Sequence, residues 1–335
     1  MPLPLEPHAS GEEVRDLHRR LASAGYPSHT DTLDRYGAET VAAVCAFQLA
    51  RGLASTGTCD MATWSHLVEA GFRLGDRLLY LHSPMLRGDD VADLQLRLGS
   101  LGFDAGRIDG IFGVQTERAL AEFQRNAGLP TDAIAGQETI RELSRLGAKT
   151  DLRDPVAVVR EREHLRRTPR SLVGRRIVLG EFGGSAALVL ATARHLRELA
   201  ASVVTLHHPD SSRQAADTNA AEAEMYLAVQ TCAEPECTAL YFATTGYVSE
   251  GGKRLAELVA LAMQTTLLFD CITLGSRTSV LRETRMPAVH LRVGPASTVS
   301  TQLATLAVAL ATATERWFVE PLDESHPQPQ PLLGP

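Results

Sequence analysis

The amino-acid sequence predicts a multidomain chain, in which two small three-helix repeats are followed by an α/β domain with a mostly parallel sheet. Two observations carry this prediction. A pattern of apolar and glycine residues recurs in the first half after about 77 residues, as from Val14 to Val91. From Arg176 onward, apolar strand-like segments alternate with helical ones. A length of 335 residues leaves room for two or three domains.

The composition is that of a globular protein, with 44% apolar and 22% charged residues. The 33 Lys and Arg residues face 40 Asp and Glu residues, which gives a net charge of −7. This balance argues against nucleic acid or an anionic membrane as the main partner. Because no uncharged apolar stretch reaches the ~18 residues of a membrane span, the sequence does not predict an integral membrane protein.

The compartment is predicted from the first residues and the cysteines. The segment MPLPLEPHASGEE has neither the basic region nor the apolar core of a secretory signal. An odd number of cysteines without such a signal predicts reduced thiols in the cytoplasm. The five are Cys45, Cys59, Cys232, Cys237 and Cys271. The spacing from Cys232 to Cys237 is too wide for the usual C-x₂-C zinc site.

The two repeats are expected over residues 1–72 and 78–147. In the second, Val91, Leu94 and Leu98 lie on one face of a helix that Gly102 ends. Further helices are predicted from Thr116 to Gln124 and from Gly136 to Leu146. The later matched pairs between the repeats include Tyr36 with Phe112, Gly37 with Gly113, Thr40 with Thr116, Phe47 with Phe123, Gln48 with Gln124 and Gly52 with Gly128.

The second repeat carries the signature DGxFGxxT, followed by FQ and GL, and it resembles the peptidoglycan-binding domain type 1 family. In the first repeat the aspartate–glycine pair is reduced to Asp34-Arg35. The resemblance implies that the second repeat can bind a glycan. The candidate residues are Asp109, Gly110, Phe112 and Gly113. The alternative is that they serve only the core and a tight turn.

Residues 148–175 are predicted to form an Arg-rich linker, within which 156–167 has the pattern of a basic amphipathic helix. Two uses of this segment are open. Its arginines can pair locally with Glu161 and Glu163 in a solvated linker, or they can dock an acidic protein partner. The docking candidates are Arg160, Arg166 and Arg167.

The α/β domain is expected over residues 176–320, and the Pro-rich tail 321–335 is predicted to be disordered. Strands are predicted at 176–179, 202–206, 225–229, 238–243 and 287–293, and helices at 186–200, 212–223, 252–266 and 300–318. Such alternation predicts a mostly parallel sheet covered on both faces, with a ligand site at the carboxyl ends of its strands.

The part from Arg176 onward resembles the zinc-dependent N-acetylmuramoyl-L-alanine amidases (amidase type 3). With two repeats before it, the chain is similar to their CwlM-type actinobacterial branch. The segments that carry this similarity are 77–103, 216–221, 270–274 and 281–289. The resemblance implies a zinc ion held by His, Glu and His, and a catalytic Glu.

The residues that this chemistry needs are absent from the matching positions. Phe182 stands for the first His, Gln230 for the second and Arg292 for the catalytic Glu, and the loop that supplies the Glu ligand is missing after Gly184. The sequence therefore predicts neither a catalytic residue nor a bound metal or other cofactor. His207, His208 and His290 could converge on a rebuilt site, but no carboxylate partner for them is evident from the sequence.

The resemblance implies a cytoplasmic pseudoenzyme that regulates peptidoglycan precursor synthesis by binding the cytoplasmic enolpyruvyl transferase of that pathway. Two alternatives are a working zinc-dependent amidase and a non-catalytic protein that binds peptidoglycan fragments.

Overall fold

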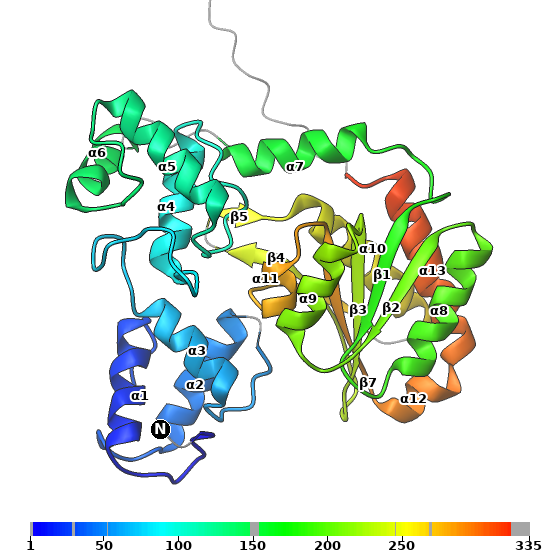
Figure 1. Ribbon diagram of the computed structural model, residues 1–335. Coiled ribbons are helices and arrows are strands. Elements are labelled where there is room, and N and C mark those ends of the chain that lie inside the picture. Colours follow the sequence, from blue (N-terminus) through cyan, green and yellow to red (C-terminus); the bar gives the residue numbers. More distant parts are fainter. Residues whose placement is uncertain are drawn as a thin grey trace, which may run out of the picture. The chain divides into compact units, whose positions relative to one another are not determined.

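The computed structural model describes residues 3–28, 31–51, 53–147, 154–244, 246–267 and 270–322. Gly52, the start of the expected linker (148–153) and most of the expected tail (323–335) lie outside these ranges. The chain divides into two compact units (Figure 1). The first comprises Met1–Val159, Ala243–Tyr247 and Ser276–Thr278, and the second Arg160–Phe242, Val248–Gly275 and Ser279–Pro335.

The first unit contains the two predicted three-helix repeats. The helices are α1 (Glu12–Ser23), α2 (Ala38–Ala50) and α3 (Met61–Ala70), then α4 (Asp89–Ser100), α5 (Val114–Ala127) and α6 (Gln137–Gly147). Each repeat has its own core. Tyr36 and Phe47 are buried in the first, and Phe112 and Phe123 take the same places in the second. The prediction of two small helical repeats is confirmed.

Buried glutamines join the helices of each repeat to the loops between them. In α5, Gln124 Nε2 donates to the Ile134 carbonyl (3.1 Å) and its Oε1 accepts from the Ala133 N–H (2.8 Å). In α2, Gln48 makes the matching bonds to the Thr58 carbonyl (2.9 Å) and the Gly57 N–H (3.0 Å). The Gln of the FQ motif therefore supplies the partner of one backbone N–H in each repeat, and it adds a second hydrogen bond to a carbonyl that also accepts from a backbone N–H.

The second unit is an α/β layer structure. Its strands are β1 (Arg176–Glu181), β2 (Ser202–His207), β3 (Met225–Thr231), β4 (Glu236–Thr244), β5 (Tyr247–Val248), β6 (Ile272–Ser276) and β7 (Ala288–Gly294). The order is β2-β1-β3-β7-β4-β5, and β6 pairs with β4. The four neighbouring strands β2, β1, β3 and β7 run parallel to one another, and β4 runs antiparallel to β7. The predicted mostly parallel sheet is confirmed.

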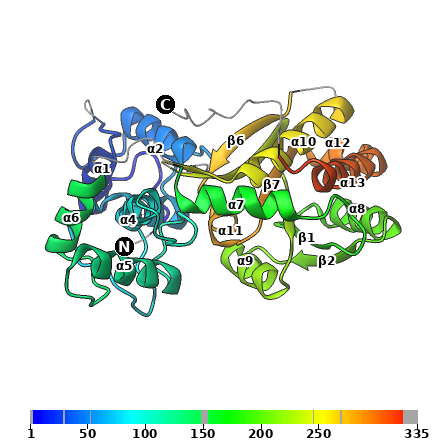
Figure 2. The ribbon, with the colours of Figure 1, turned by 90° about the horizontal axis from the view of Figure 1, so that it is seen from above.

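Helices cover both faces of this sheet (Figure 2). One face packs on α8 (Ala186–Glu198), α10 (Glu250–Leu267) and α13 (Leu303–Val319), whose apolar residues join those of the strands in one core. The other face carries α9 (Ser211–Ala220) and α11 (Ser279–Glu283). The predicted closing helix is two helices, because α12 (Ala296–Thr301) ends at Gln302 before α13 begins.

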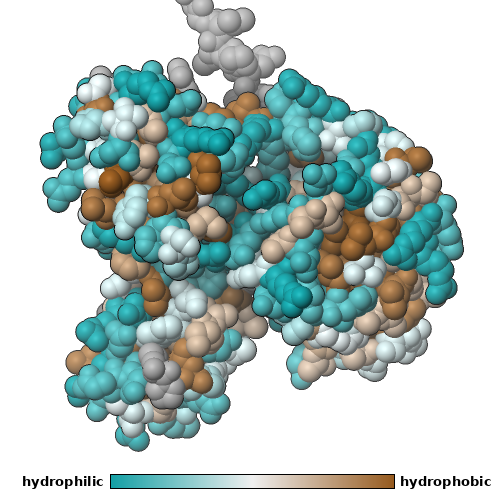
Figure 3. All heavy atoms as spheres, in the orientation of Figure 1, coloured by the Kyte–Doolittle hydropathy of each residue, from teal (hydrophilic) through white to brown (hydrophobic). Residues whose placement is uncertain are grey.

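The surface agrees with a globular composition. In the view of Figure 3, hydrophilic residues cover most of each unit and apolar residues lie in separate patches. Among the described helices, none combines the length and the hydropathy that crossing a bilayer would require.

The cysteines differ from the prediction. Cys237 and Cys271 form a disulfide, so the expectation of five reduced thiols is wrong for this pair. The reason is tertiary, because pairing of β6 with β4 brings together two residues that are 34 apart in the sequence. Cys45, Cys59 and Cys232 are free thiols.

Candidate functional site

The candidate site lies at the carboxyl ends of β1, β3 and β7. In the β3–β7 pair, Gln230 lies opposite Arg292. The turn after β1 is fixed to the end of β3, because the Phe182 N–H (3.2 Å) and Ser185 Oγ (2.8 Å) both donate to the Val229 carbonyl. The structure therefore brings the three sequence-predicted positions to one edge of the sheet, as expected for a parallel sheet.

Arg292 is held by a carboxylate. Its Nη2 lies 3.0 Å from Glu236 Oε2, and Thr238 Oγ1 donates to the other oxygen of Glu236 at 3.1 Å. Cys232 lies beside this pair. The pKa of its thiol is raised, mainly by burial and to a smaller extent by the negative charge of Glu236. The guanidinium of Arg292, which the sequence analysis predicts at the position of the catalytic Glu, thus has its own counter-charge.

His290 lies beneath Phe182. The two ring centroids are 4.9 Å apart with an interplanar angle of 52°. The imidazole is buried, and neither ring nitrogen has a hydrogen-bond partner among the described residues. Burial, with a smaller contribution from Arg292, lowers the pKa of His290 to about 3. The ring is therefore neutral at physiological pH.

His207 and His208 do pair with carboxylates, which corrects the sequence-based expectation. His207 Nδ1 is 3.7 Å from Glu181 Oε1, because the β1–β2 register places these residues side by side. His208 Nε2 is 3.3 Å from Asp217 Oδ2 on α9. The histidines thus have separate partners instead of converging with His290. No group of three or more His, Cys, Asp or Glu residues within the described ranges could hold a metal ion.

The residues that the sequence analysis predicts at the family's zinc positions do not fit this ion. The phenyl ring of Phe182 offers no ligand atom, and a side-chain amide such as that of Gln230 is a poor ligand beside the imidazole and thiolate that zinc prefers. The guanidinium of Arg292 adds a positive charge, which opposes a divalent cation. No catalytic step through zinc follows from this set of side chains.

The four glycan-binding candidates shape the turn before α5. Asp109 Oδ1 accepts from Gln95 Nε2 (3.0 Å) and from the Ile111 N–H (2.9 Å). Gly110 has a φ of 73°, and a Cβ there would lie 2.9 Å from the Gly88 carbonyl oxygen. Phe112 is fully buried, and Gly113 directly precedes α5 as its N-cap. These contacts give each residue a role in the fold of the repeat.

The three docking candidates lie on α7 (Val156–Arg167), which forms over the predicted residues. Arg160, Arg166 and Arg167 are exposed. Glu163 pairs locally with Arg166 (2.9 Å) and Arg167 (3.7 Å).

The opposite face of α7 packs against the start of α10. Glu161 accepts from Ser249 Oγ (2.6 Å), Arg162 pairs with Glu250 (3.0 Å), and Leu165 is buried. The segment therefore presents basic side chains outward from a helix that is fixed on its inner face.

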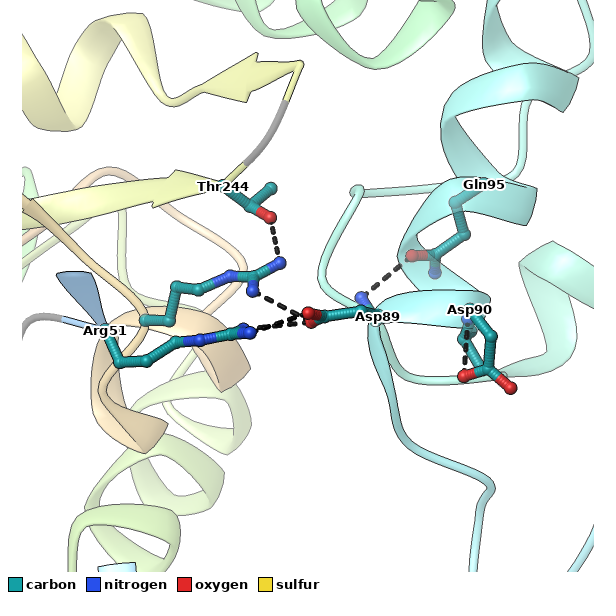
Figure 4. A network of polar contacts seen from close by, with 8 residues as sticks. Arg51, Asp89, Asp90, Gln95 and Thr244 are labelled. Atoms are coloured by element: carbon teal, nitrogen blue, oxygen red, sulfur yellow. Dashed lines mark hydrogen bonds and ion pairs between the residues drawn. The ribbon is translucent and has the colours of Figure 1, made fainter. Parts of the chain in front are cut away.

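A network that the sequence did not predict lies in the first unit, around Asp89 (Figure 4). Arg51 donates to both carboxylate oxygens (2.9 and 2.7 Å) and Arg277 Nη1 donates to Oδ1 (2.8 Å). Arg277 also donates to Thr244 Oγ1. Burial acts to raise the pKa of Asp89, but the bonds from Arg51 and the charge of Arg277 outweigh it, so the pKa lies below its usual value.

Comparison with known proteins places these features in a family. The sequence matches the family described as "Putative peptidoglycan binding domain" at residues 10–67 and 87–143. It is 35% identical over 322 residues to the N-acetylmuramoyl-L-alanine amidase CwlM of Mycobacterium tuberculosis. This alignment covers 84% of this chain and 79% of CwlM. It is also 33% identical over 168 residues to the N-acetylmuramoyl-L-alanine amidase CwlL of Bacillus licheniformis, covering 45% of that protein.

Among solved structures, the N-acetylmuramyl-L-alanine amidase Ami1 of Mycobacterium smegmatis aligns with a TM-score of 0.38 and 11% identity. That alignment covers 44% of this chain and 98% of Ami1. The extent of the match to CwlM, together with the two repeats before an α/β domain, settles the family. The chain belongs to the N-acetylmuramoyl-L-alanine amidase homologues that include CwlM.

Proposed function

We propose that this chain is a catalytically inactive amidase homologue, which acts as a cytoplasmic regulator of peptidoglycan precursor synthesis through protein binding. One observation supports the loss of catalysis above the others. The positions of two metal ligands and of the catalytic carboxylate carry Phe182, Gln230 and Arg292, and the charge of Arg292 is already balanced by Glu236.

The remaining features suit binding. The outward face of α7 offers Arg160, Arg166 and Arg167 on a helix whose inner face is fixed, so little backbone order has to be gained on docking. An acidic protein surface is the partner that this charge favours. From the relation to the CwlM-type branch, we propose the cytoplasmic enolpyruvyl transferase of the precursor pathway as that partner.

Metal analysis tests the inactive site. After incubation with zinc and dialysis, the purified chain is expected to retain far less than one zinc per chain and to release no peptide from muropeptides. A variant carrying Phe182→His, Gln230→His and Arg292→Glu is the matched control, and it should bind zinc at least ~10-fold more tightly because it regains two imidazoles and loses the cation. One zinc per parent chain, or measurable hydrolysis, would contradict the proposal.

Charge reversal tests the docking face. Arg166→Glu with Arg167→Glu should weaken binding to the enolpyruvyl transferase by about 10-fold or more at low salt, because two attractive charges become repulsive. Isothermal titration calorimetry measures the affinity, and circular dichroism checks that α7 persists.

The paired control is Arg15→Glu with Arg19→Glu, which reverses two exposed arginines on α1. Unchanged affinity of the α7 variant would move the interface elsewhere. If peptidoglycan sacculi bound the parent protein and the transferase did not, the regulatory function would be wrong.

A further inference from the structure

The disulfide joins two neighbouring strands of the second unit at one end. Cys237 is the second residue of β4, and Cys271 directly precedes β6. In the described part of the sheet, β6 pairs with β4 alone. Its side chains are largely outside the core, and Ile272 is 57% exposed. Since little apolar burial holds β6 in place, the covalent bond has an unusually large share in fixing it.

The far end of the same strand pair bears a second, polar connection. Thr244 ends β4 and Arg277 follows β6, and the two side chains are hydrogen-bonded. Arg277 also donates its backbone N–H to the Arg51 carbonyl (3.1 Å) and its guanidinium to Asp89 (2.8 Å). The position of β6 therefore decides where Arg277 is presented.

The free thiol nearest in sequence has different surroundings. Cys237 contributes to the apolar core and lies opposite Val293 of β7. Cys232 interacts instead with Arg292 and Glu236, at the edge that holds the candidate site. Because Cys232 is not part of the disulfide, its substitution is a suitable control for changes at Cys237 and Cys271.

We propose that Cys237–Cys271 is a redox switch that sets the order of β6 and the presentation of Arg277. A dithiol reductant attacks one sulfur as its thiolate, the S–S bond breaks, and a mixed disulfide forms. The second thiol of the reductant then releases the protein thiol. In total, two electrons and two protons convert the disulfide into two thiols while the dithiol becomes a disulfide. Oxidised glutathione reverses the change.

In the oxidised form β6 is fixed to β4. In the reduced form β6 separates more readily and the Arg277 contacts weaken. The switch gives the proposed cytoplasmic regulator a means of control, because disulfides in that compartment mostly respond to redox conditions, but its chemistry does not depend on that function.

Hydrogen exchange with mass spectrometry tests the switch in the full-length protein. Reduction with dithiothreitol should make the backbone amides of 272–277 exchange at least about 10-fold faster, while those of β1 and β3 stay unchanged. The melting temperature should fall by about 5–10 °C. Cys271→Ser should show the fast exchange with or without reductant. Cys232→Ser should behave as the parent protein does.

Alkylation in defined glutathione buffers gives the second measurement. Cys237 and Cys271 should become reactive together as the buffer becomes more reducing. The proposed switch would be overturned if the hydrogen-exchange rate of β6 were the same with and without reductant. It would also be overturned if both cysteines were alkylated in air-exposed protein without reductant. Either result would leave the zinc and transferase measurements as they stand, and bound zinc or hydrolysis would leave the exchange result intact.

Discussion

Replacing Asp89 by asparagine is expected to destabilise the first unit by about 2–3 kcal/mol. The carboxylate accepts charge-assisted hydrogen bonds from Arg51 and Arg277, and the substitution leaves two guanidinium groups facing one neutral amide. Breaking a fully buried ion pair costs about 3–5 kcal/mol, and the partial exposure of Asp89 lowers this figure. Chemical denaturation followed by circular dichroism measures the change.

The pH dependence of the same variant has a defined sign. Because the pKa of Asp89 is lower in the folded than in the unfolded protein, its contribution is fully present above the unfolded pKa of about 4. It is lost as the pH falls through the folded pKa. The stability difference between parent and Asp89→Asn should therefore shrink between pH 5 and the acid limit.

The control is Asp93→Asn on the same helix, whose carboxylate is similarly half-buried but pairs with the single arginine Arg97 at i,i+4. It should cost less than about 0.5 kcal/mol. Equal effects of the two substitutions would show that Asp89 contributes no more than a surface charge.

Replacing Gln124 by leucine is expected to cost about 3 kcal/mol in the second repeat. The amide is buried and bonds the Ala133 N–H and the Ile134 carbonyl. Leucine would leave the Ala133 N–H without this partner, whereas the Ile134 carbonyl would keep its bond from the Gly136 N–H (2.9 Å). Ala133 also holds a φ of 57°, a conformation that needs such support in a residue with a Cβ. Urea denaturation measures the loss.

Gln48→Leu in the first repeat should have an effect of similar size, because Gln48 makes matching bonds there. Gln115→Leu, at an exposed position of α5, should change stability by less than about 0.5 kcal/mol. If Gln124→Leu lowered the free energy of unfolding as little as Gln115→Leu does, Gln124 would not stabilise the repeat, and its presence in the motif would point to ligand binding.

Local patterns explain which features could be predicted. The helices of the repeats follow from apolar residues at i, i+3 and i+7 with glycine ends, and the signature residues recur at matching positions. The strands β1, β2, β3 and β7 could be predicted because each is a short apolar segment between helical ones. Because carboxyl ends of parallel strands share one edge, the neighbourhood of Phe182, Gln230 and Arg292 followed as well.

The short elements β5, β6 and α11 could not be predicted in this way. β6 has five residues and a mostly exposed pattern, so it lacks the alternation that marks a half-buried strand. Its partner β4 runs antiparallel to β7, and the sequence has no local signal for that direction. The helix α11 has only five residues, which is too short for a helical periodicity of apolar residues to be recognised.

The sequence alone determined the repeated helices and the alternation of the longer strands and helices, and it predicts the loss of the family's ligand residues, because each of these depends on residues close together in the chain. Only the tertiary structure decided the Cys237–Cys271 bond, the Arg51–Asp89–Arg277 network and the carboxylate partners of His207 and His208. Apart from the His208–Asp217 contact, which spans nine residues, those contacts join positions far apart in sequence. Their formation depends on which strands become neighbours and in which direction they run, and these choices are set by the burial of the whole sheet.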